Sequence, residues 1–118
     1  MYGLETEVID KINAVFEEIP DIEKVILCGS RAKGNYKIGS DIDLTLQGHQ
    51  LSLDTIYEVM DKLDNLYLPY HFDISIYDEI DNPDLIEHIK RVGLIFYHRE
   101  KEQIPAGWEK IDFEKCLE

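Results

Sequence analysis

Apolar side chains recur at intervals of three and four residues in separate stretches of the chain, which predicts amphipathic helices. These stretches cover residues 4–18, 52–66 and 83–92. Thr6 is the expected N-cap of the first helix. Asn82, which is followed by a proline, is the expected N-cap of the third. Each helix is therefore expected to bury one apolar face against the rest of the domain.

Shorter apolar runs and strictly alternating segments lie between these helices and predict β-strands. Residues 25–28 and 94–97 are apolar runs, whereas residues 41–46 and 70–77 alternate between apolar and polar positions. The resulting order is helix, strand, strand, helix, strand, helix, strand. This order predicts an α+β fold, in which helices pack on a small mixed sheet.

The alternation over residues 41–46 places Asp41 and Asp43 on the same face of their strand. Two carboxylates at this spacing lie about 7 Å apart, so their charges repel unless they share a proton or bind a cation. Oxygen ligands of this kind favour Mg²⁺ or Mn²⁺. Taken alone, the pattern is explained equally well by a polar strand face that is open to water.

The segment before this acidic pair carries basic side chains and no acidic ones, which favours a binding site over a polar surface. No acidic residue occurs between Lys24 and Ser40, although the whole chain carries a formal net charge of -13. Gly29 and Ser30 offer backbone N–H groups and a hydroxyl at a turn that an anion can approach closely. A basic segment directly before two carboxylates favours binding of a polyphosphate together with its metal ion.

The composition indicates one small domain with an acidic surface. The chain has 118 residues, of which 44% are hydrophobic, enough to form one core. Only 12 basic residues stand against 25 acidic ones, so direct binding of nucleic acid is not expected. The excess negative charge instead favours a basic protein partner.

Other classes of site are not supported by the sequence. Cys28 and Cys116 lie far apart and predict neither a disulfide framework nor a zinc site, and Cys28 is expected to be a small buried side chain. His49 and His71 are expected to be solvated or structural residues. No signal peptide or membrane-spanning run is recognisable, so we expect a cytoplasmic protein.

The string Gly29-Ser30, ten intervening residues and then Asp41-x-Asp43 resembles the signature of the DNA polymerase β-type nucleotidyltransferase superfamily. The fuller form, GSRAKG followed by SDIDL, is similar to that of the minimal nucleotidyltransferases, or MNT proteins. Lys33 departs from this pattern, because many relatives carry arginine there. The substitution keeps the positive charge but loses the bidentate geometry of a guanidinium group.

The resemblance implies the polymerase β-like fold and a set of functional residues. Its catalytic and metal-binding carboxylates would be Asp41, Asp43 and Asp73. Its nucleotide-binding residues would be Gly29, Ser30, Arg31, Lys33 and Ser40. The implied cofactor is a pair of Mg²⁺ ions, with Mn²⁺ as a substitute, and the implied donor is ATP. Asp73, from the strand over residues 70–77, would complete the metal site and help to deprotonate the attacking hydroxyl.

The resemblance also implies a partner and a reaction. In the MNT family it points to a helical HEPN-type toxin, with the MNT chain acting as antitoxin by transferring AMP to a tyrosine of the toxin. We thus expect a hetero-oligomer, with a homodimer as a further option. Two alternatives stay open: a nucleotide-binding module that blocks its partner by occlusion alone, and a transferase acting on a small molecule such as an antibiotic.

The end of the chain follows a different pattern from the rest. Residues 1–98 are expected to form the nucleotidyltransferase domain, and residues 99–118 a C-terminal tail with weak periodicity around a single tryptophan, Trp108. An aromatic side chain of this kind is suited to docking, either on the chain's own surface or on a partner.

Overall fold

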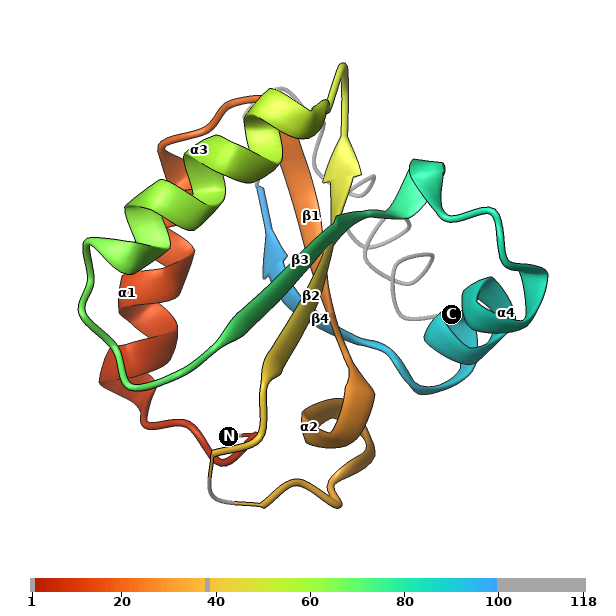
Figure 1. The fold of residues 1–118 in the computed structure, drawn as a ribbon, viewed down its shortest axis with the longest axis horizontal. Coiled ribbons are helices and arrows are strands. Elements are labelled where there is room, and N and C mark those ends of the chain that lie inside the picture. The colour runs from red at the N-terminus through yellow and green to blue at the C-terminus, as the bar shows by residue number, and fades with distance from the viewer. Residues whose placement is uncertain (1, 38, 100–118) are drawn as a thin grey trace, which may run out of the picture.

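The computed structural model describes residues 2–37 and 39–99, which form a four-stranded sheet flanked by helices (Figure 1). The strands lie in the order β3-β2-β1-β4, and β2 and β3 are parallel whereas β1 is antiparallel to both β2 and β4. Their bounds are Ile22–Cys28 (β1), Ile42–Gly48 (β2), Phe72–Ile76 (β3) and Leu94–His98 (β4). The expected mixed sheet is confirmed.

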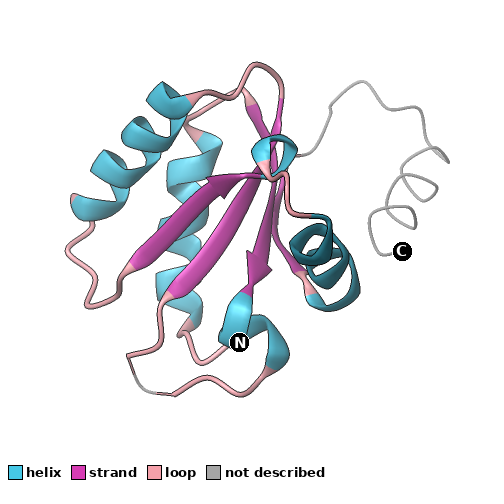
Figure 2. Cartoon of the chain, turned by 45° about the vertical axis from the view of Figure 1, so that its right-hand side comes forward, coloured by secondary structure: helices cyan, strands magenta, loops and turns pink. Residues whose placement is uncertain are grey.

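The helices lie on both sides of this sheet. Helices α1 (Thr6–Glu17) and α3 (Leu53–Asp64) pack together on one side, and α4 (Pro83–Val92) lies on the other (Figures 1 and 2). The short α2 (Gly29–Lys33) directly follows β1. The expected α+β architecture is therefore confirmed, with one sheet face covered by two helices and the opposite face left for α4 and the site described below.

The hydrophobic core lies between the sheet and the pair α1 and α3. Ile42, Leu44 and Leu46 of β2 are at most 1% exposed, as the alternating pattern of this strand predicts. They join Ile12 and Phe16 of α1 in one cluster. Burial of a large aliphatic or aromatic side chain contributes about 1.5–3 kcal/mol, so this cluster fixes the position of β2. The alternate residues of β2, Asp43 among them, consequently point to the other face.

The structure corrects the expected elements in several places. The turn after β1 is the helix α2 and not a loop, and Gly34, with a φ of +87°, ends it in a conformation that favours glycine. Glu5 and not Thr6 occupies the N-cap position of α1, whereas Asn82 caps α4 as predicted, with its side chain accepting hydrogen bonds from two backbone N–H groups. A 3₁₀ turn, η1 (Tyr77–Glu79), follows β3.

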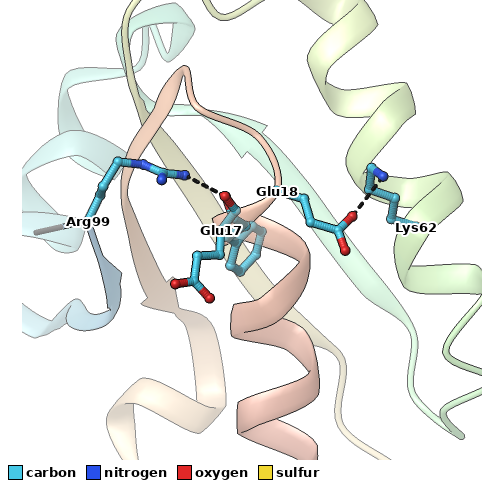
Figure 3. A network of polar contacts seen from close by, with 5 residues as sticks. Glu17, Glu18, Lys62 and Arg99 are labelled. Carbon is cyan, nitrogen blue, oxygen red and sulfur yellow. Dashed lines mark hydrogen bonds and ion pairs between the residues drawn. The ribbon is translucent and has the colours of Figure 1, made fainter.

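The side chain of Arg99, at the end of the described chain, is hydrogen-bonded to the backbone at and just after the C-terminus of α1. Its guanidinium group donates hydrogen bonds to the carbonyl oxygens of Phe16, Glu17, Ile19 and Ile22 at 2.9, 3.2, 3.0 and 3.0 Å. Figure 3 shows the guanidinium group of Arg99 pointing toward Glu17 at the end of α1. The last carbonyls of a helix lack partners within the helix, and a cation there also complements the helix dipole. Arg99 therefore belongs to the folded domain. Residues 100–118, with Trp108 and the predicted docking of the tail, lie outside the described part.

We expect Arg99→Met to lower the free energy of unfolding by about 2–3 kcal/mol, because it removes the charged donor of four backbone carbonyl groups between Phe16 and Ile22. Urea unfolding followed by circular dichroism measures this loss. Lys62→Met is the matched control, since it removes the exposed ion pair between Lys62 and Glu18, 2.9 Å apart (Figure 3), and we expect a much smaller loss from it. Equal losses in the two variants would contradict the role given to Arg99.

Candidate active site

The register between β2 and β3 brings two of the predicted carboxylates side by side. Asp43 and Asp73 are direct partners in this parallel pair. Neighbouring strands lie about 4.8 Å apart, and partnered residues of a parallel pair point to the same face. Asp41 is exposed and directly precedes β2. The fold therefore gathers the three predicted acidic residues near the end of the sheet where β2 and β3 begin.

The charges in this group act on one another. Burial, followed by repulsion from Asp73 and then from Asp41, raises the pKa of the Asp43 carboxyl. Cys28, the partner of Asp43 on β1, is also affected: burial, and then the charges of Asp43 and Asp73, raise the pKa of its thiol to about 11. Cys28 is half-buried beside the carboxylates and remains protonated at neutral pH, so it is not a nucleophile there.

Gly29 allows the chain to pass directly over Asp43. Its φ is +69°, and a Cβ atom at this position would collide with Oδ2 of Asp43. Both facts require glycine, one for backbone conformation and the other for space. The first residue of the predicted Gly-Ser pair therefore lies against the central carboxylate, and its role in binding phosphate stays a prediction.

A cleft of about 420 Å³ opens beside Asp43 and Asp73. One wall holds Cys28, Gly29, Asp43, Asp73 and Ser75. The opposite wall comes from Ile80 and from α4, which contributes Leu85, His88 and Ile89. The sequence motif gave no sign of this second wall. The periodicity of α4 marks Leu85 and Ile89 as inward-facing, but only the packing of α4 shows that they face the cleft together with His88.

The remaining predicted nucleotide-binding residues lie in different surroundings. Ser30 is half-buried in the first turn of α2, and Lys33 is exposed at its end. The Ser40 hydroxyl accepts a hydrogen bond from the backbone N–H of Lys37 at 2.8 Å. Arg31 is only 3% exposed and donates hydrogen bonds to backbone carbonyls. The nucleotide-binding roles of Ser30, Lys33, Ser40 and Arg31 stay predictions, and the contacts of Arg31 give it a structural role.

The carboxylates suit a divalent cation that arrives with a phosphate ligand. Among the side chains of residues 2–37 and 39–99, no cluster of three or more His, Cys, Asp or Glu is arranged to hold a metal ion. Mg²⁺ does not need such a cage, since it usually binds one or two carboxylates together with water and substrate phosphates. Burial, and then the charges of Asp73 and Asp41, raise the pKa of Asp43, and a bound cation would favour its ionised form. The donor set therefore fits Mg²⁺ bound with a triphosphate.

A further prediction concerns the stability of the ligand-free fold. Because the pKa of Asp43 is raised on folding, stability falls as the pH rises from the ordinary value of 3.8 through the raised value. Asp43→Asn cannot ionise, so we expect it to raise the Tm at pH 7 in the presence of EDTA. The gain should shrink as the pH approaches 3.8. A Tm difference that does not change with pH would contradict this account of Asp43.

The sequence comparison agrees with this geometry. The model of the family described as polymerase beta, nucleotidyltransferase matches residues 10–102, which include the Gly-Ser pair and all three carboxylates. The chain belongs to this family. It is thus a nucleotidyltransferase with a polymerase β-like fold, as the resemblance predicts. No curated protein matches the chain by sequence. No described helix of this nucleotidyltransferase is long and apolar enough to cross a membrane.

Several solved structures share the fold of this nucleotidyltransferase. One, a toxin–antitoxin with AMP-PNP, is 19% identical with a TM-score of 0.64, over 92% of this chain and 88% of that chain. The toxin–antitoxin MntA–HepT is 16% identical with a TM-score of 0.60, over 96% and 89%. A tri-AMPylated Shewanella oneidensis HEPN toxin in complex with MNT antitoxin gives the same identity and TM-score, over 97% and 89%. At these identities the likeness establishes the shared fold.

Proposed function

We propose that this nucleotidyltransferase transfers AMP from ATP to a tyrosine hydroxyl of a HEPN-type toxin and thereby acts as its antitoxin. The observation that carries the proposal is the pairing of Asp43 with Asp73 beside Asp41, at the edge of a cleft in a chain of this family. Paired carboxylates next to a glycine turn are the arrangement that metal-dependent phosphoryl chemistry needs.

Residues in the cleft and directly beside it have separate roles in the proposed reaction. Asp41 and Asp43 would hold Mg²⁺ together with the triphosphate, and Gly29 and Ser30 would contact its β and γ phosphates. Asp73 takes part in removing the proton from the acceptor hydroxyl. When bound, a pair of Mg²⁺ ions supplies positive charge to the triphosphate and lowers the pKa of the hydroxyl. The hydroxyl oxygen forms a bond to the α-phosphorus while the bond from that phosphorus to the pyrophosphate oxygen breaks.

A protein acceptor is supported by the shape and charge of the chain. The described helices and strands form one unit around one sheet, and the cleft lies at the edge of that unit. A formal net charge of -13 favours a basic partner. The similar folds belong to antitoxins that were crystallised with toxins, one of them AMPylated. We therefore propose a hetero-oligomer with a HEPN-type protein, in the cytoplasm, where ATP and Mg²⁺ are available.

A labelling experiment tests the reaction type and the donor together. The purified chain is mixed with its HEPN-type partner, Mg²⁺, and ATP labelled either at the α or at the γ phosphate. Transfer of AMP labels the partner from α-labelled ATP only, whereas a kinase would use the γ label. α-Labelled GTP, CTP and UTP then establish the base preference.

The same experiment separates the two alternative functions. An unlabelled partner in a stable complex would overturn the proposal in favour of an occluding module. In that case Asp41→Asn should still neutralise the toxin. Label in a low-molecular-weight product, with a candidate small hydroxyl compound in place of the partner, would instead assign a small-molecule acceptor.

A further inference from the structure

Arg31 has the features of a residue that holds the site together. Among residues 2–37 and 39–99 it is the one charged side chain that is buried, at 3% exposure. A buried charge costs free energy unless hydrogen bonds and opposite partial charges compensate it. The surroundings of Arg31 provide this compensation through two backbone carbonyls and two aromatic rings.

The guanidinium group of Arg31 binds its neighbours on several sides. Nε and Nη2 donate to the carbonyl oxygen of Ser40 at 3.2 and 3.0 Å, and Nη1 donates to that of Tyr2 at 2.8 Å. Its central carbon lies 5.4 Å from the ring centre of Tyr36 and 5.3 Å from that of Tyr70. Only the planar fork of an arginine can make these contacts together, because two N–H groups converge on one carbonyl oxygen, a third reaches another carbonyl, and the cation also contacts two aromatic rings.

These partners stand next to the catalytic carboxylates in the chain. Ser40 directly precedes Asp41, and Tyr70 lies three residues before Asp73. The segments in which they lie are also joined directly, since the backbone N–H of Ile42 donates to the carbonyl of His71 at 2.9 Å. Arg31 therefore fixes the backbone at the points where the two carboxylate-bearing strands begin.

We propose that Arg31 is a positioning residue for the carboxylate site and not a ligand of the triphosphate. It holds the carbonyl of Ser40 and the ring of Tyr70 in place, so that Asp41 and Asp73 keep the spacing that the metal and the donor require. The proposal rests on the proposed transfer of a nucleotide and assigns this residue a role within it. It replaces the nucleotide-binding role predicted from the positive charge of Arg31.

The experiment compares Arg31→Lys with Arg31→Met in the complex with the partner. Lysine keeps the charge but cannot reproduce the fork, so we expect kcat to fall about 10–100-fold in both variants, as for a small misplacement of catalytic groups. The KM for ATP should change less than about threefold, and half-maximal activity should need more Mg²⁺. The matched controls are Arg91→Lys and Arg91→Met, at an exposed arginine in the last turn of α4, where kcat should stay unchanged.

Near-wild-type kcat in Arg31→Lys, together with a raised KM for ATP in Arg31→Met, would overturn the proposal, because a phosphate ligand acts through its charge. If Arg31→Met does not fold, Arg31→Lys alone decides, since the two roles predict opposite results for it. Hydrogen–deuterium exchange gives a readout that needs no activity: the amides of Ser40 and Ile42 should exchange faster in Arg31→Lys. Unchanged exchange overturns the positioning role, whereas absence of transfer in the wild-type protein overturns only the proposed function.

Discussion

Asp43→Asn is expected to lower the rate of AMP transfer at least about 1,000-fold, because it removes a carboxylate at the centre of the acidic group and with it several kcal/mol of metal-mediated stabilisation. Asp43 interacts with both other carboxylates. It is paired with Asp73 across the strands, and the charge of Asp41 contributes to raising its pKa. Single-turnover transfer of label from α-labelled ATP to the partner measures the loss.

The loss of activity should not come from a loss of folding. The neutral side chain removes repulsion in the ligand-free protein, so the inactive variant should melt at a higher temperature than the wild type. Asp64→Asn, at the exposed end of α3, is the matched control and should retain full activity. Transfer within tenfold of wild type by both Asp43→Asn and Asp41→Asn would remove these carboxylates from the mechanism.

Gly29→Ala is expected to have the second-largest effect, because it combines backbone strain with a collision. A left-handed conformation costs a non-glycine residue about 1–2 kcal/mol, and the added Cβ would also displace the Asp43 carboxylate. We expect transfer to fall about 100-fold or more, since the carboxylate would leave the position that the donor needs. Thermal melting and single-turnover transfer are measured on the same preparation.

Gly34→Ala is the control that separates backbone strain from the collision with Asp43. Gly34 also has a positive φ, +87°, but no atom lies within 4 Å of the place where its Cβ would be. This variant should lose stability through strain alone and keep its transfer rate within about threefold. If Gly29→Ala and Gly34→Ala reduced the transfer rate equally, the collision with Asp43 would not be the cause.

The α+β fold and the candidate residues of the glycine turn and the Asp-x-Asp strand could be predicted from local sequence patterns. The period of two over residues 41–46 predicts the burial of Ile42, Leu44 and Leu46 and places Asp43 on the opposite face, although Thr45 on that face is also buried. Asp41, Asp43 and Gly29 could be identified as site residues from the local sequence alone, through the Asp-x-Asp spacing and the turn that precedes it. Asp73 required the resemblance as well, because strand pairing joins residues that are distant in the sequence.

Two features of the site depend on tertiary packing and could not be predicted from the sequence: the second wall of the cleft and the surroundings of Arg31. The second wall of the cleft, with Leu85 and His88, exists because α4 lies on the side of the sheet opposite to α1 and α3 (Figure 1). The contacts of Arg31 with the rings of Tyr36 and Tyr70 were likewise not expected from the sequence, and its role in nucleotide binding stays a prediction. Neither arrangement has a signature in spacing or composition.

Intact mass spectrometry of the partner is the most direct test of the central claim. The purified complex is incubated with ATP and Mg²⁺, and both proteins are weighed, with Asp43→Asn as the control. The account predicts a mass increase on the partner equal to one or more AMP groups, lost when its acceptor tyrosine is replaced by phenylalanine and absent with Asp43→Asn. An unmodified partner, or an equal increase with Asp43→Asn, would contradict it.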